Sequence, residues 1–172
     1  MALPPAEDLL IELLDKSHNR AAFDCGEEEL DAYLHRYARQ NAASGVGLTY
    51  VAVFPSAPSA ILGYFTLSMS RVERALLPPN LKVPPYPVPT LLLARLAISR
   101  EAQGLRLGEK LLYAVLARAL FLSGEAGLWA VEVEALHERA ARFYARYGFI
   151  PFSDSPLHLF LPIETIRKSL NP

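Results

Sequence analysis

The sequence has one cysteine, Cys25, among its 172 residues, so no internal disulfide can form. Disulfides persist mainly in oxidising compartments, and a lone cysteine fits a reducing one. No apolar run approaches the ~18 residues that a membrane-spanning helix needs. The first fourteen residues carry Glu7, Asp8 and Glu12 without a basic flank, unlike a secretory signal peptide. These absences predict a cytoplasmic protein that does not enter a membrane.

A large excess of one charge is also absent, because the formal net charge is −1. That value is unlike a typical nucleic-acid-binding domain. The distribution is uneven: residues 1–34 hold nine acids and two bases (−7), and residues 35–172 hold nine acids and fifteen bases (+6), which sum to −1. Two interpretations stay open, an acidic N-terminal arm on a mildly basic body or ordinary solvated charge.

The residues that are present suit one globular domain over 1–172, since 52% are hydrophobic and 20% are charged. Hydrophobic periodicity predicts an α/β (α+β) order of strands and helices. Six prolines in 71–90 predict a connection there, because proline lacks the backbone donor that a sheet requires. We expect strands over 9–14, 48–54, 60–70, 91–98, 129–135, 149–152 and 157–161, and helices over 27–43, 107–122, 138–147 and 163–170.

The first candidate site is the turn 103–108, which joins the apolar strand 93–98 to a helix. Free N–H groups at a helix N-terminus, together with the helix dipole, attract anions. Gly104 and Gly108 would let the backbone approach such an anion closely. The pattern predicts a pyrophosphate-binding turn. Taken alone, the two glycines could equally serve only the turn that any strand–helix connection needs.

The second candidate is Tyr144, within the run 142–149 after the strand 129–135. Its ring could belong to the core with Phe143 and Phe149. Alternatively, its hydroxyl could project into a cleft between two strands and act as a general acid. The pattern by itself does not decide between these roles.

Taken together, the motifs resemble the GNAT N-acetyltransferases over almost the whole chain. Gln103 and Gly108 follow Leu96-Ala97-Ile98, and His137, Ala140, Tyr144 and Gly148-Phe149 follow downstream. The resemblance is sharpest toward the tRNA-acetylating toxin branch. Its motifs are Phe23-Asp24-Cys25-Gly26 with Leu30-Asp31 and Tyr33-Leu34, then Gly63-Tyr64-Phe65-Thr66-Leu67-Ser68, and then Pro84–Pro89 leading to Leu93–Ile98.

The resemblance implies a mixed, twisted sheet of about six to seven strands flanked by helices, with acetyl-CoA as co-substrate and no metal. It implies an N-acetyltransferase acting on a primary amine, with Tyr144 as the general acid. The implied partners are aminoacyl-tRNA, a ribbon-helix-helix antitoxin and a second copy of the chain. The implied cofactor-binding residues are Leu96, Ala97, Ile98, Gln103, Gly104, Leu105, Arg106, Leu107, Gly108, Glu109 and His137.

Three positions depart from the family pattern. Arg106 replaces the middle glycine of the turn, and we expect it to keep ordinary backbone angles and to contact a phosphate. His137 stands where an asparagine often holds the pantetheine arm. Leu48 replaces an arginine that is common in the toxin branch, which together with the low net charge weighs against RNA binding.

Three functions therefore stay open: acetylation of aminoacyl-tRNA, acetylation of a small amine or protein N-terminus, and a non-enzymatic acyl-CoA-binding or partner-binding relic. The candidates for a general base are Glu132, Glu134 and His137, none with a distinguishing pattern. An antitoxin is expected to contact a basic surface, for which the candidates are Arg39, Arg142 and Arg146.

Overall fold

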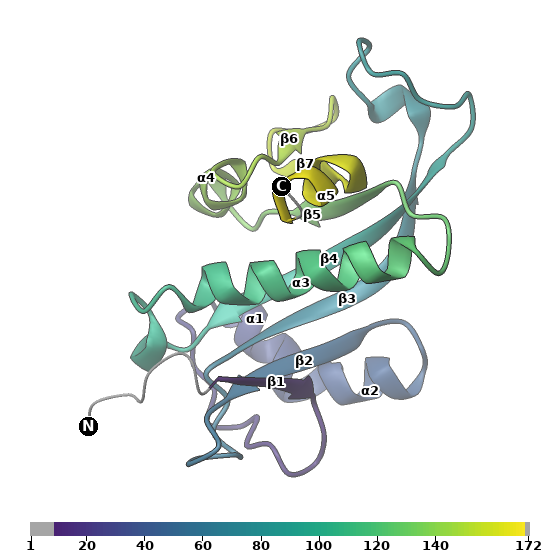
Figure 1. Ribbon diagram of the computed structural model, residues 1–172. Helices are drawn as coiled ribbons and strands as arrows, with labels where there is room; N and C mark the ends of the chain where they lie inside the picture. The colour runs from purple at the N-terminus through teal and green to yellow at the C-terminus, as the bar shows by residue number, and fades with distance from the viewer. Residues whose placement is uncertain (1–8, 171–172) are drawn as a thin grey trace. The chain divides into compact units, whose positions relative to one another are not determined.

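The computed structural model describes residues 9–170. By its backbone contacts the chain divides into two compact units. The first contains the described part of Met1–Ser68 together with Ala94–Ala114, and the second contains Met69–Leu93 and the described part of Val115–Pro172. Strands of both belong to a mixed seven-stranded sheet with the order β1-β2-β3-β4-β5-β7-β6 (Figure 1). The predicted sheet of six to seven strands is confirmed.

The first unit begins with antiparallel strands. β1 (Leu10–Leu13) pairs with β2 (Leu48–Val53), and β2 pairs with β3 (Gly63–Val72) in the register Tyr50 opposite Phe65. The predicted hairpin is therefore confirmed. Gly63 is required by close packing, because an added Cβ would lie 2.8 Å from Ile98 Cδ1 and 2.9 Å from the Ala97 carbonyl oxygen.

The helix predicted over 27–43 is interrupted. It consists of α1 (Glu28–Ala32), a π-helical turn η2 (Tyr33–Tyr37) and α2 (Ala38–Ala43). Periodicity did not predict the π turn, because its wider winding depends on partners far along the chain. Arg20 Nη1 supplies them by donating to the Leu34 and His35 carbonyls, at 3.4 and 3.0 Å.

One core cluster of the first unit joins this helical segment to the sheet. Phe23, Tyr33, Leu34 and Ala38 pack with residues of three strands, Val51, Val53, Tyr64 and Ala97. A separate cluster joins Phe54, Leu62, Ala102 and Leu107, with Ile98 packed against it. The 3₁₀ turn η4 (Arg100–Ala102) and the beginning of α3 (Leu107–Ser123) are thus anchored to the unit by apolar side chains.

The second unit is built on β5 (Ala130–Glu134), which is parallel to β4 (Val88–Ile98) over Thr90–Leu93 and antiparallel to β7 (His158–Pro162). β6 (Ile150–Pro151) pairs with β7, and the helices are α4 (Glu138–Ala145) and α5 (Ile163–Leu170). Strand β4 starts earlier than predicted and includes Pro89, whose carbonyl accepts from the Trp129 N–H.

The proline-rich connection packs on the second unit, as expected from its apolar residues. It contains the 3₁₀ turn η3 (Arg74–Leu76). Leu76, Leu81 and Val83 lie against a core of Val72, Leu77, Val88, Ala130, Phe152 and Phe160. In the described part of the chain, no helix is long and apolar enough to cross a membrane.

Candidate active site

The turn 103–108 has the backbone geometry of an anion site. Gly104 has φ +86°, and α3 begins at Leu107, whose side chain is 2% exposed in the core. Within a helix the N–H groups of its first turn have no carbonyl acceptor, so those of Leu107, Gly108 and Glu109 are available to a ligand. Gln103, Leu105 and Arg106 are exposed. The buried Leu107 side chain therefore fixes the beginning of α3, whose first N–H groups have no acceptor within the helix.

The backbone conformation of Arg106 differs from our expectation. Its φ is +61°, in the left-handed region, and not among the ordinary angles that we expected. A non-glycine residue there costs about 1 kcal/mol or more. The Arg106 carbonyl accepts from the Lys110 N–H, and Arg106 Nε lies 3.2 Å from Glu109 Oε2. The arginine side chain is 82% exposed, so this ion pair contributes little to stability. The family's glycine at this position has a backbone reason.

The Gln103 side chain fixes the turn by two hydrogen bonds to backbone carbonyls. Its Nε2 donates to the Cys25 and Ile98 carbonyls, both at 3.0 Å. Next to it, the Arg100 N–H donates to the Asp24 carbonyl, and Arg100 Nε lies 3.0 Å from Asp24 Oδ1. The loop 24–26 therefore holds the segment that enters the turn. The sequence of this loop matches the family pattern, but its contact with Gln103 was not predictable from it, because the two backbone partners of Gln103 lie 78 and five residues away.

The loop cysteine is not a reactive group. Burial, aided by the nearby Asp31 carboxylate, raises the pKa of the Cys25 thiol to about 12. The neutral thiol predominates at physiological pH, and the thiolate is the nucleophilic form. Cys25 belongs to the core cluster of the first unit.

The strand residues predicted to contact the cofactor precede the turn in the same unit. Ala97 is 5% exposed and packs in the core, and Leu96 and Ile98 are half-buried. All three belong to β4, the strand that enters the turn through η4. The structure thus brings together Leu96–Ile98 and Gln103–Glu109, the predicted cofactor segments, within one unit.

Tyr144 lies in the second unit, on α4, and is 6% exposed. Its ring packs edge-on against Phe143 and Phe149, with centroids 5.2 and 5.5 Å away. Burial raises the pKa of its phenol above the ordinary value, so the hydroxyl is protonated at neutral pH. The packing role and the donor role that the sequence left open are both compatible with this position.

His137 caps α4. Its Nδ1 accepts from the Ala140 N–H at 3.2 Å, which leaves the proton of a neutral ring on Nε2. The cap explains why a histidine works at a position where the family often has asparagine, since both side chains offer an acceptor. Among the other candidate bases, Glu134 is exposed and Glu132 is 6% exposed.

Glu132 is part of a buried polar network that the sequence did not reveal. Thr90 Oγ1 donates to Glu132 Oε1 at 2.8 Å, and His158 Nε2 lies 2.5 Å from Glu132 Oε2. His158 Nδ1 lies 3.0 Å from Asp154 Oδ2. Because both oxygens of Glu132 have partners, it is poorly placed to act as a general base. The only sequence signal was a glutamate alternating with valines in a strand, which equally fits an exposed face.

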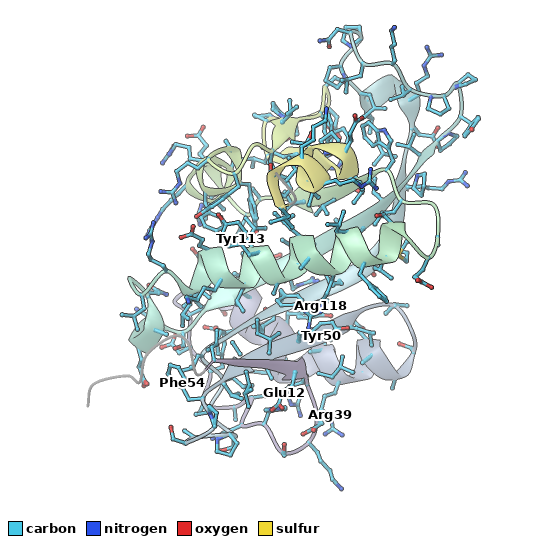
Figure 2. All side chains as sticks on the ribbon, in the orientation of Figure 1. Glu12, Arg39, Tyr50, Phe54, Tyr113 and Arg118 are labelled. Atoms are coloured by element: carbon cyan, nitrogen blue, oxygen red, sulfur yellow. The ribbon has the colours of Figure 1, made fainter. Side chains whose placement is uncertain are left out.

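Of the three arginines proposed as antitoxin contacts, Arg142 and Arg146 lie at α4, whereas Arg39 lies on α2. Arg142 Nη1 lies 3.9 Å from Glu138 Oε2, and Arg146 lies over the Phe143 ring at 5.7 Å, both in the second unit. Arg39 is exposed on α2 in the first unit (Figure 2).

Comparison with known proteins shows the family to which the chain belongs. The model of the acetyltransferase (GNAT) domain matches residues 47–151. A tRNA-acetylating toxin of Mycobacterium tuberculosis is 34% identical over 85% of this chain and 87% of its own, and a probable TacT toxin of Sinorhizobium fredii is 28% identical over 98% of both.

Solved structures extend the similarity to the fold. The toxin AtaT in complex with acetyl-methionyl-tRNAfMet has a TM-score of 0.88 at 33% identity, covering 95% of this chain and all of that one. AtaTR bound to acetyl-CoA has a TM-score of 0.85 at 34% identity, covering 96% and 99%. The chain belongs to the GNAT acetyltransferase family and is an acetyltransferase that uses acetyl-CoA.

Proposed function

We propose that the chain is a toxin that transfers the acetyl group of acetyl-CoA to the α-amine of an aminoacyl-tRNA. The observation that carries this proposal is the similarity, over nearly the whole chain, to a toxin whose structure contains an acetylated aminoacyl-tRNA. The tRNA-acetylating toxin of Mycobacterium tuberculosis, at 34% identity, supports the same substrate class. Both matches extend beyond residues 47–151, which the family model covers.

The first unit would bind the co-substrate. The N–H groups of Leu107, Gly108 and Glu109 would hold the pyrophosphate, with Gly104 and Leu105 completing the turn. Backbone N–H groups of Leu96 and Ala97 would stabilise negative charge on the thioester oxygen during attack, with Ile98 as part of the same strand. The residues fit the group, since the turn presents donors and is supported from below by Gln103.

The acceptor amine needs little help from a base. An α-amine has a pKa of roughly 7.7–8.0, against about 10.4 for lysine, so a useful fraction is neutral near pH 7. Tyr144 would protonate the departing thiolate, since a phenol with a pKa near or above 10 stays protonated at neutral pH. Two relatives, KacT and AtaT, have solved structures of tyrosine-to-phenylalanine variants, one of KacT and three of AtaT, which supports testing a tyrosine in this role.

The test is mass spectrometry of bulk aminoacyl-tRNA after incubation with the protein and acetyl-CoA. The expected result is an acetyl group on the α-amine of one or a few aminoacyl species. Reactions without acetyl-CoA and with deacylated tRNA are the controls. Acetylation of added small amines or protein N-termini, with aminoacyl-tRNA unchanged, would contradict the tRNA assignment and favour the second function left open by the sequence.

We further propose a single acetyltransferase domain over 1–172 that acts in the cytoplasm, pairs with a second copy and is held inactive by a ribbon-helix-helix antitoxin. AtaT was solved with the C-terminus of the antitoxin AtaR, which supports an antitoxin partner. Expression in a bacterial host should stall growth, and co-expression of a neighbouring ribbon-helix-helix protein should restore it. Unaffected growth with catalytically active protein would contradict the toxin role.

A further inference from the structure

Arg95 carries a positive charge within the central strand β4. It lies in β4, on the face that also carries Leu93 and Ala97, which are 0% and 5% exposed. Its own side chain is half-buried. Across residues 9–170 the structure gives its guanidinium no carboxylate partner within ion-pair distance. A charge in such surroundings is costly unless something pairs with it.

One face of the guanidinium is already used. Arg95 Cζ lies 3.7 Å from the ring centroid of Tyr33, a cation–π contact. Stacking uses the face of the planar group and leaves its edge of N–H donors for a ligand. That edge matches the two oxygens of a phosphate or carboxylate better than any other side chain does.

The tyrosine beneath Arg95 is rigidly held. Tyr33 is 5% exposed, stacks with Tyr64 at a centroid distance of 6.5 Å, and its hydroxyl accepts from Asn41 Nδ2 at 3.2 Å. It is also the first residue of the π turn, a feature often found at functional sites. The turn is fixed by His35 Nε2, 2.9 Å from the Phe23 carbonyl, as well as by Arg20. This arrangement is a preorganised platform.

The position of Arg95 relates it to the proposed chemistry. Arg95 is adjacent to Leu96 and Ala97, whose amides we assign to the thioester oxygen, within the same unit. A strand rises about 3.3 Å per residue, so the Arg95 backbone lies within about 7 Å of both assigned amides along the strand. We therefore expect its long side chain to reach groups bonded to the reacting amine. In an aminoacyl-tRNA the amino acid carboxyl is esterified, and the nearest anion is the phosphate of the terminal nucleotide.

We propose that Arg95, stacked on Tyr33, binds the phosphate of the 3′-terminal nucleotide of the acceptor RNA. The inference rests on the proposed function and specifies how its acceptor end is held. A free amino acid could offer a carboxylate to the same guanidinium, so the experiment separates the two anions.

The test compares binding of two acceptor-stem RNA minihelices that end in CCA and carry no amino acid. One RNA has native linkages, and the other has a neutral methylphosphonate at the last linkage. Arg95→Gln should raise the Kd for the native RNA by about 10- to 100-fold, as for a hydrogen bond between charged groups. The same substitution should change the Kd for the RNA with the methylphosphonate at its last linkage by less than about twofold. Arg167→Gln, at an exposed arginine of α5, controls for the loss of one positive charge.

Thermal unfolding and acetyl-CoA affinity, both expected to be unchanged in Arg95→Gln, show whether the variant is folded. Arg95→Lys keeps the charge without the planar edge and should bind the native RNA with intermediate affinity. Equal losses on both RNAs, or no loss on either, would overturn the proposal. So would an effect confined to acetylation of free amino acids. Because binding is measured with RNA that carries no amino acid, the result does not depend on whether aminoacyl-tRNA is acetylated. Mass spectrometry of aminoacyl-tRNA tests that question separately.

Discussion

The turn 103–108 of the first unit and the Glu132–His158 network of the second differ in whether their polar groups have hydrogen-bond partners within the protein. In the network, the Glu132 carboxylate, the His158 imidazole and the Thr90 hydroxyl are buried and hydrogen-bonded to one another, and the exposed Asp154 carboxylate pairs with His158. At the turn, the first N–H groups of α3 lack an acceptor within the helix, Arg106 has a positive φ, and the Gln103 side chain fixes the backbone by two hydrogen bonds. Polar groups that are hydrogen-bonded to one another stabilise a fold, whereas fixed donors without an intramolecular acceptor can bind a ligand.

The largest expected effect concerns Tyr144. Tyr144→Phe keeps the ring contacts with Phe143 and Phe149 and removes only the hydroxyl. If the hydroxyl is the general acid, kcat should fall by about 10²- to 10⁴-fold, while thermal stability and acetyl-CoA affinity stay unchanged. Steady-state kinetics and calorimetry check this. A stable variant that keeps more than about half of the wild-type kcat would assign Tyr144 to packing alone.

The next effect is on stability and depends on pH. Burial lowers the pKa of His158, but its hydrogen bonds with Glu132 and Asp154 outweigh this, so the net pKa is raised above the ordinary value. A raised folded-state pKa gives stabilisation that is complete below about pH 6.5 and is lost as pH rises through the folded-state pKa. His158→Gln should therefore lower the free energy of unfolding by about 3 kcal/mol at pH 6.

Denaturant unfolding of wild type and His158→Gln between pH 6 and 9 measures this dependence. The difference between them should shrink as pH rises. Glu134→Gln, at the exposed neighbour on β5, should change stability little at any pH and serves as the control. A gap between wild type and His158→Gln that stays constant or widens with pH would show that the network is not held by a charged imidazole.

A smaller effect is expected in the turn. Gly108→Asp places a side chain and a negative charge in the first turn of α3, beside the pyrophosphate of the proposed complex. We expect the Kd for acetyl-CoA to rise by about 10- to 100-fold, because like charges at close range repel strongly. Gly127→Asp adds the same group where the nearest 4 Å are open, and it should leave the affinity unchanged. Unaltered affinity in Gly108→Asp would remove the turn from the cofactor site.

The smallest effects concern Arg106, and they should have opposite signs. Arg106→Gly should relieve the strain of φ +61° and raise the free energy of unfolding by about 1 kcal/mol. It should also remove a phosphate contact and weaken acetyl-CoA binding by about 1 kcal/mol, roughly fivefold. Unfolding and calorimetry on one preparation separate the two effects. Equal or tighter binding would mean that the arginine is only tolerated in the turn.

Much of the fold was predictable because local patterns determine it. The terminal helix Ile163–Leu170 was predicted with its observed bounds, and the turn before α3 was identified from Gly104 and the apolar strand before it. The missed features depend on distant partners. The π turn at Tyr33 needs Arg20, and the burial of Glu132 needs His158, 26 residues away. Arg106 was misjudged because a sequence names a residue without giving its φ.

The central claim is that the acceptor is an aminoacyl-tRNA, and one comparison of rates tests it most directly. The measurement is kcat/KM for an aminoacyl-tRNA and for the amide of the same amino acid, which offers the same α-amine without the RNA. If the chain recognises the RNA as well as the amine, kcat/KM should be at least about tenfold higher for the aminoacyl-tRNA, equivalent to about 1.4 kcal/mol of added transition-state binding. Equal values, or a preference for the amide, would contradict the account and identify the chain as a small-amine acetyltransferase.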